Sequence, residues 1–182
     1  MSREIMESSL IRLTEFESPL GQMIAGSTEE GICLLEFADN ARRIEKEIAS
    51  LEQLLGARVV HGEDPHLEVL TQQLAEYFKG VRKVFTLPLV TPGSLFLQEV
   101  WHELLKIPYG TTRSYMDQAK ALGKPDAIRA VAHANGMNRI SIIIPCHRVV
   151  GSDGKMTGYG GGIWRKKRLL ELETGPDLTL WE

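Results

Sequence analysis

The segment TPGS at 91–94 divides the chain into two parts that have different hydrophobic patterns. Proline and glycine close together interrupt helices and strands alike, so a segment of this composition favours a domain boundary. Before it, short apolar runs alternate with stretches of helical periodicity, and after it the pattern is mostly helical. The 182 residues are enough for two small domains that each bury a core. We therefore predict two domains, 1–91 and 92–182.

The first part predicts an α/β domain whose sheet is mostly antiparallel. Glycine, serine and threonine separate its apolar runs, which is typical of strands joined by tight turns. Apolar residues then recur at helical spacing from Ile44 to Leu55, and Gly56 follows as a stop signal. The predicted elements are two or three antiparallel strands within 18–39, a helix over 41–56, a short strand over 57–62, a helix over 66–80 and a strand over 83–90.

The second part predicts a mostly α-helical domain. A helix over 94–106 begins at a plausible cap, Ser94. Two shorter helices follow, over 114–123 and 125–136, and the turn between them contains Gly123 and Pro125. Two short helices joined by a tight turn are typical of a helix-turn-helix motif, although many helical hairpins share this pattern.

The charge of the chain is distributed unevenly. The net charge of −3 argues at first against a nucleic-acid partner. Residues 1–90 carry six more acidic than basic residues, however, whereas 91–182 carry three more basic than acidic ones. Either the two domains merely differ in acidity, or only the second one meets a polyanion.

Neither a membrane location nor a disulfide framework is predicted. No apolar run approaches the roughly 18 residues of a membrane span, and the N-terminus lacks a signal-like apolar core. The two cysteines, Cys33 and Cys146, form no CxxC motif. We expect a cytoplasmic protein without a disulfide and without a bound metal.

Cys146 is the strongest candidate for chemistry. A cysteine after three isoleucines is most often a buried apolar residue, but Pro145 ends the run, and His147 and Arg148 can favour a thiolate. Neighbouring side chains point apart, so adjacency alone does not bring Cys146 and His147 into contact. A metal site is a poor alternative because the ligand spacing is wrong. Cysteine protease or amidase chemistry stays open, since it needs a histidine and an Asn or Asp from elsewhere in the chain.

Two other features allow opposing interpretations. The glycine run at 158–162 precedes a helix, where it could bind a phosphate, but the lysine spacing of a P-loop is missing. The basic run RKKR at 165–168 either contacts phosphates or forms the exposed face of the last helix, and we favour the exposed face.

The segment IPCHRV, preceded by ANGMNRISI and followed by GSDGKMTGYGGGIWRKKRLLELE, resembles the O6-alkylguanine-DNA alkyltransferases of the bacterial single-function type. The resemblance extends without gaps over 94–173. It implies a ribonuclease-H-like α/β domain followed by a mostly α domain with a winged-helix-like helix-turn-helix. It also implies a cofactor-free monomer that binds double-stranded DNA through the minor groove and flips out a base. The alkyl group of O6-alkylguanine would pass irreversibly to a cysteine, once per molecule, and O4-alkylthymine is a second candidate substrate.

The resemblance also assigns residue roles. Cys146 is the nucleophile, a water links it to His147, and Glu173 holds the other nitrogen of His147. Without the resemblance, Glu173 would be interpreted as a solvated helix residue and Tyr115 as a half-buried tyrosine. By the same resemblance, Tyr115 hydrogen-bonds the extruded base and Asn138 braces the active-site turn. Arg129 fills the gap in the DNA, and Ala127 and Ala130 lie on a slim DNA-binding helix. The residues implied around the base are Tyr159, Gly160, Val149 and Met137.

The chain departs from the family pattern at two places. Many relatives have Asn-Pro where this chain has Asn138 and Arg139, and they often have glycine after Ala-Val, where this chain has Ala132-His133. Both differences concern turn geometry and rate. Alkyltransferase-like proteins, which bind lesions without repairing them, carry tryptophan at the position of Cys146, so the cysteine argues against that alternative. A transcription regulator with a helix-turn-helix would need neither the cysteine turn nor the glycine run.

Overall fold

A four-stranded mixed sheet forms the N-terminal half of the molecule in the computed structural model, which describes residues 9–175. The strands lie in the order β3-β2-β1-β4, with β1 and β2 and then β2 and β3 paired antiparallel, and β4 parallel to β1. Their bounds are Leu10–Ser18 for β1, Gly21–Thr28 for β2, Gly31–Phe37 for β3 and Arg58–His61 for β4. Two antiparallel strands therefore lie within 18–39 as predicted, and a third precedes them.

Helices α1 (Ala41–Leu55) and α2 (Pro65–Phe78) pack on opposite faces of the sheet. The alternation of side chains along a strand divides its apolar residues between the faces, so Ile24 packs with α1 while Met23 packs with α2. Gly56 ends α1 in the left-handed conformation, which explains why the predicted boundary is correct.

The predicted strand over 83–90 is wrong. This segment runs beside β3, but it forms only a single bridge, between Leu89 and Ile32. The amide of Ile32 donates to the Pro88 carbonyl at 2.9 Å, and the Val90 amide donates to the Ile32 carbonyl at 2.8 Å. Pro88 has no N–H group of its own, so the segment cannot continue a ladder.

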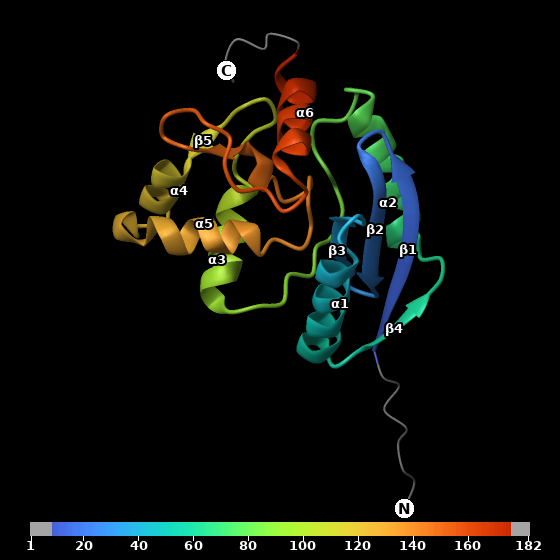
Figure 1. The fold of residues 1–182 in the computed structure, drawn as a ribbon. Coiled ribbons are helices and arrows are strands. Elements are labelled where there is room, and N and C mark those ends of the chain that lie inside the picture. The colour runs from blue at the N-terminus through green and yellow to red at the C-terminus, as the bar shows by residue number, and fades with distance from the viewer. Residues whose placement is uncertain (1–8, 176–182) are drawn as a thin grey trace, which may run out of the picture.

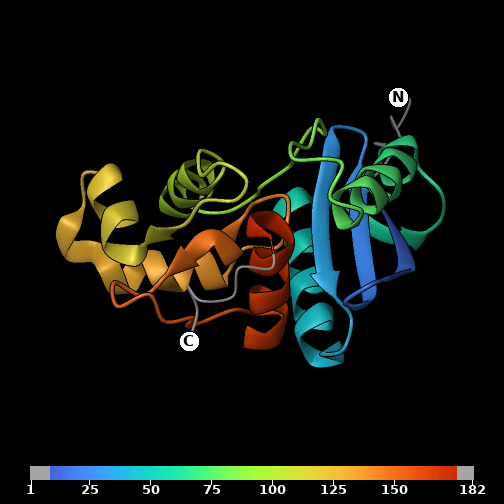
Figure 2. The same cartoon turned by 90° about the horizontal axis from the view of Figure 1, so that it is seen from above.

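The C-terminal half is helical, and it lies beside the sheet half (Figure 1). A two-stranded parallel pair, β5 and β6, and two 3₁₀ turns, η1 and η2, connect its helices. In both views α6 lies at the junction between the two halves (Figures 1 and 2). The bounds are Leu95–Leu104 for α3, Arg113–Ser114 for β5, Tyr115–Ala121 for α4, Pro125–Ala127 for η1, Ile128–Gly136 for α5, Cys146–Arg148 for η2, Val149–Val150 for β6 and Ile163–Thr174 for α6.

Helices α4 and α5 form the helix-turn-helix. A reciprocal pair of amides joins them: Gln118 donates to Asn135 at 3.0 Å and Asn135 donates to Gln118 at 2.7 Å, both buried. Because each buried amide satisfies the other, the pair fixes how the two helices cross. The second helix begins at Ile128 rather than at Pro125, because Pro125 starts the 3₁₀ turn η1.

A single apolar core connects the two halves. It joins Leu35 and Phe37 of β3 to Trp101 of α3 and to the segment around Ile140. The C-terminal half therefore packs on the N-terminal sheet and is not merely tethered to it. Within residues 9–175, no helix has the length and apolar character that a membrane span needs.

Candidate active site

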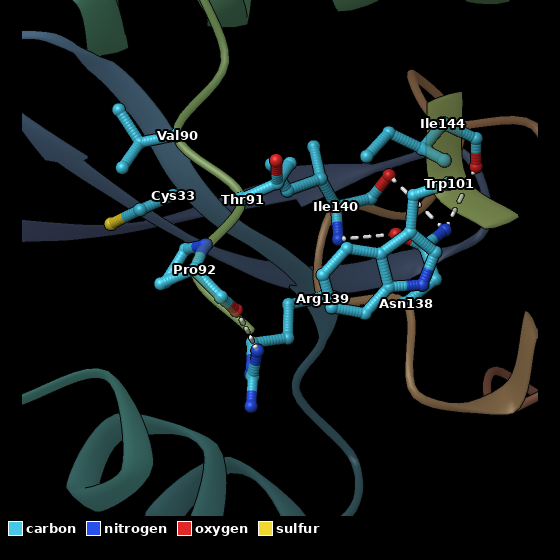
Figure 3. Close-up of a pocket in the computed structure, with 9 residues that line it drawn as sticks. All are labelled: Cys33, Val90, Thr91, Pro92, Trp101, Asn138, Arg139, Ile140 and Ile144. Carbon is cyan, nitrogen blue, oxygen red and sulfur yellow. Dashed lines mark hydrogen bonds between the residues drawn. The ribbon is translucent and has the colours of Figure 1, made fainter. Parts of the chain in front are cut away.

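The chain makes a strained turn just before Cys146. Ile142 has φ of 72°, and no other non-glycine residue in the described part of the chain has a positive φ. A β-branched residue in this conformation costs about 1–3 kcal/mol, so the surroundings must impose it. Asn138 supplies part of that restraint, because its side chain accepts from the Ile140 amide at 2.9 Å and donates to the Ile144 carbonyl at 2.8 Å (Figure 3).

Cys146 begins η2 and is half-buried. The Asn138 amide nitrogen lies 3.3 Å from its sulfur. Burial raises the pKa of the Cys146 thiol above its ordinary 9.0, and the ionised Glu36 adds to this effect. The Asn138 hydrogen bond and the charges of Lys166 and Arg43 oppose it without reversing it. Cys146 is therefore a thiol at neutral pH in the free protein.

This result corrects the prediction that His147 and Arg148 favour a thiolate. The Arg148 side chain is turned toward Glu173, to which it donates at 2.8 and 3.0 Å, and toward the Ile107 carbonyl at 2.6 Å. Its charge is paired there and does not act on the sulfur. The positive charges that act on Cys146 come from Lys166 and Arg43 instead.

Glu173 is the centre of a buried polar cluster, and not a solvated helix residue. Its carboxylate accepts from His147 Nε2 at 2.7 Å, from the Tyr77 hydroxyl at 2.7 Å and from the Gly110 amide at 3.2 Å, in addition to Arg148. Burial alone would raise the pKa of Glu173, but His147 and Arg148 outweigh it and hold the pKa at about 2. Glu173 is therefore ionised throughout the physiological range.

His147 is completely buried, and burial lowers its pKa despite the neighbouring carboxylate. The imidazole is therefore neutral at pH 7. Because ionised Glu173 can only accept, Nε2 carries the proton and Nδ1 keeps its lone pair. Nδ1 is buried and has no hydrogen-bond partner among the described residues.

We predicted that the basic run at 165–168 forms the exposed face of the last helix, and this is correct for two of its residues and wrong for the other two. Lys167 and Arg168 are exposed, but Arg165 and Lys166 are buried. Lys166 was missed as a site residue. Its ammonium group donates to the Val149 carbonyl and, at 2.8 Å, to the Thr157 carbonyl. Burial lowers the pKa of Lys166 to about 8, and the neighbouring Cys146 thiolate would raise it.

Tyr115 lies against the loop that precedes the glycine run. Its hydroxyl donates to the Thr157 carbonyl at 3.1 Å, the same atom that accepts from Lys166. Burial raises the pKa of Tyr115, so it keeps its proton at neutral pH. Within the glycine run, the Tyr159 hydroxyl is buried and has no partner among the described residues. A Cβ on Gly160 would collide with the Arg43 guanidinium, so a side chain at this position would require the Arg43 side chain to move.

The other predicted site residues lie at different depths. Met137 is half-buried, whereas Val149 is completely buried and presents its carbonyl to Lys166. On the helix-turn-helix, Arg129 and Ala130 are exposed and Ala127 is half-buried. No group of three His, Cys, Asp or Glu side chains comes together as a metal site within residues 9–175.

Comparisons with known proteins agree with this architecture. The family model of the ribonuclease-like domain of 6-O-methylguanine DNA methyltransferase matches residues 11–91, and the model of its DNA-binding domain matches residues 95–175. Methylated-DNA–protein-cysteine methyltransferase of Methanosarcina barkeri is 43% identical over 86% of this chain and 93% of its own length. The constitutive enzyme of Bacillus subtilis is also 43% identical, over 86% of this chain and 91% of its own. The crystal structure of Mycobacterium tuberculosis OGT in complex with DNA has a TM-score of 0.77 at 39% identity, and covers 94% of this chain and 98% of that one.

A ribonuclease-like α/β domain followed by a helical DNA-binding domain defines a class of DNA repair methyltransferases. The chain belongs to the methylated-DNA–protein-cysteine methyltransferase family. It transfers the alkyl group of O6-methylguanine in DNA to a cysteine of the protein. The fold class and the activity predicted from the resemblance are thereby confirmed.

Proposed function

We propose that Cys146, and not Cys33, accepts the alkyl group. The observation that carries this proposal is the difference between the two sulfur environments. Cys33 is 1% exposed, and burial raises its pKa to about 12, so it has neither access nor a reactive form. Cys146 is half-buried, hydrogen-bonded by Asn138 and close to the buried charge of Lys166. A reactive free thiol also fits a reducing compartment such as the cytoplasm.

His147 removes the thiol proton in this mechanism. Its Nδ1 has a free lone pair, and Glu173 fixes the tautomer that leaves it free. One water molecule bridges the sulfur and Nδ1, because neighbouring side chains do not meet directly. Because Cys146 is protonated in the free protein, this transfer accompanies the reaction and does not precede it.

The alkyl transfer is an in-line displacement. The bond from sulfur to the alkyl carbon forms while the bond from that carbon to O6 of guanine breaks, and guanine leaves with the electron pair. Tyr115 donates a proton to the leaving base and regains one from solvent, to which His147 releases the thiol proton, so the proton lost by sulfur balances the one gained by guanine. The buried ammonium of Lys166 stabilises the negative charge that develops on the leaving base. The product is a thioether that no neighbouring side chain cleaves, so each molecule reacts once. The same displacement serves O4-alkylthymine.

DNA binding uses the outer face of α5. The reactive carbon is inaccessible within a duplex, so the base is flipped out, and the exposed Arg129 fills the gap. The small Ala127 and Ala130 allow the helix to approach the minor groove closely. The extruded base lies between Tyr115 and the segment that contains Tyr159 and Gly160, with Met137 and the backbone of Val149 nearby. A monomer suffices for this arrangement.

Peptide mass spectrometry tests the assignment. The protein is mixed with duplex DNA that carries O6-methylguanine, and its peptides are then weighed. A single methyl group is expected on the peptide with Cys146, at no more than one per molecule, and the Cys33→Ala variant should behave the same way. Repair by a Cys146→Ala variant, or methylation elsewhere in the wild type, would overturn the assignment.

A further inference from the structure

Arg139 connects the active-site turn to the N-terminal half of the molecule. Its side chain is buried, and each of its three guanidinium nitrogens has a hydrogen-bond partner, of which Figure 3 shows the Pro92 carbonyl. Nε donates to the Glu47 carboxylate at 2.6 Å and Nη2 donates to the Ser50 hydroxyl at 3.1 Å, both on α1. Nη1 donates to the Pro92 carbonyl at 3.0 Å, in the segment that joins the two halves.

The backbone around Arg139 is held by the same half of the molecule. The Leu35 amide on β3 donates to the Arg139 carbonyl at 2.8 Å, and the Ser141 amide donates to the Leu35 carbonyl at 2.8 Å. Ile140 thereby forms a parallel bridge with Leu35. Hydrogen bonds from Glu47 and Ser50 of α1 and from Leu35 of β3 therefore hold both the side chain and the main chain of this short segment from the N-terminal half.

Asn138 precedes Arg139, and it is the residue that contacts the sulfur. Its amide nitrogen lies 3.3 Å from Cys146 Sγ, and its oxygen accepts from the Ile140 amide. A shift of the Arg139 backbone would therefore move Asn138 relative to the sulfur. A continuous path of contacts therefore leads from Glu47 to the Arg139 side chain, along the backbone to Asn138, and from the Asn138 side chain to Cys146.

We propose that Arg139 is a positioning residue for alkyl transfer, through which helix α1 holds Asn138 against the sulfur of Cys146. This inference rests on the proposed role of Cys146 as the acceptor. It gives the N-terminal half a part in the reaction, since a carboxylate on α1, Glu47, anchors the guanidinium. Arg139 itself touches neither the substrate nor the reacting atoms.

The matched control is a second buried arginine that connects the two halves. Arg165 donates to Asp39 at 2.7 and 2.9 Å, to the Leu20 carbonyl at 2.8 Å and to the Gly161 carbonyl at 2.9 Å, but it has no hydrogen bond to Asn138. Glu47→Gln and Asp39→Asn each remove one charge from such a pair and keep the side-chain size. They also leave every residue of the active-site turn intact, so both are informative even if Arg139→Met folds poorly.

Two measurements on the full chain separate positioning from a purely structural role. The first is the rate of methyl transfer from O6-methylguanine DNA, and the second is the rate at which iodoacetamide modifies Cys146 between pH 7 and 10. If Asn138 and the sulfur are no longer held in place, the rate of methyl transfer should fall by about tenfold or more. Glu47→Gln and Arg139→Met should show that loss, and their iodoacetamide profile should move to higher pH because the sulfur loses its hydrogen bond. Asp39→Asn should leave the iodoacetamide profile unchanged, because Arg165 contacts neither Asn138 nor the sulfur, and it should slow methyl transfer less than Glu47→Gln does.

The opposite outcomes overturn the proposal. A purely structural ion pair would loosen the turn when broken, expose the thiol and make iodoacetamide react faster. Equal effects of Glu47→Gln and Asp39→Asn would also show that Arg139 contributes only stability. The peptide masses of the wild type keep the two proposals apart, because a methyl group on a residue other than Cys146 refutes the acceptor assignment whatever the variants do.

Discussion

Replacing Glu173 with glutamine should destabilise the fold strongly. The carboxylate accepts hydrogen bonds from four residues, and the variant would leave the buried Arg148 without its counter-charge. Breaking a buried ion pair in this way costs about 3–5 kcal/mol. The pKa of Glu173, lowered from 4.5 to about 2, independently corresponds to about 3 kcal/mol. The two magnitudes agree, so we expect a loss of about 3–4 kcal/mol at pH 7.

The pH dependence has a definite sign. A carboxylate whose pKa is lowered by folding contributes all of its stability above its unfolded pKa and loses it as the pH falls through the folded value. The difference between the wild type and Glu173→Gln should therefore be constant above about pH 5 and shrink by about half at pH 3. Urea unfolding at pH 7 and pH 3 measures it.

A neighbouring carboxylate on α6 provides the control. Glu171 pairs with the exposed Arg168 at 3.0 Å, and a surface pair of this kind contributes about 0–1 kcal/mol. Glu171→Gln should therefore unfold nearly as the wild type does. A loss below about 1 kcal/mol for Glu173→Gln at pH 7, or a loss that is unchanged at pH 3, would refute the reasoning.

Three further predictions concern reactivity. Because burial raises the pKa of Cys146 above 9.0, its modification by iodoacetamide in the free protein should still increase above pH 9, and a plateau below pH 8 would contradict this. Lys166→Met removes the buried positive charge that is proposed to stabilise the leaving base, so methyl transfer at pH 7 should slow by about 10²-fold, whereas Lys167→Met, the exposed control, should leave it unchanged. Tyr115→Phe removes the proposed proton donor, so methyl transfer measured in single-turnover experiments should slow by about 10²-fold. The affinity of the Tyr115→Phe variant for DNA, measured by fluorescence anisotropy, should change much less.

Local patterns predict the helices of the fold well and its irregular segments poorly. The helix over 41–56 follows from its apolar spacing and from Gly56, both of which act within the helix itself. The segment 83–90 has the composition of a strand, but its pairing depends on β3, which is about 50 residues away, and Pro88 blocks the ladder. The strained turn at Ile142 has no signal in the sequence, because isoleucine is among the residues least suited to it.

The candidate site shows a similar division. The residue types at Cys146 and His147 indicate chemistry on their own, whereas Glu173 could be singled out only through a resemblance. The direction in which Arg148 points could not be predicted, because it depends on Glu173 on a different element. The protonation state of Cys146 was predicted wrongly for the same reason, since burial and distant charges decide it rather than adjacent residues.

The basic run on α6 did carry a signal for burial. Arg165, Lys166, Leu169, Leu170 and Glu173 recur at spacings of one and three residues, which places all five on one face of the helix, and all five are buried. A charged side chain in register with buried leucines is costly unless it is paired. Each of the three charged side chains on this face has a partner elsewhere in the chain. Arg165 donates to Asp39, Lys166 donates to the Val149 carbonyl, and Glu173 pairs with His147. Helical register with Leu169 and Leu170 therefore indicates which charges of the run are buried, whereas only the structure identifies what they bind.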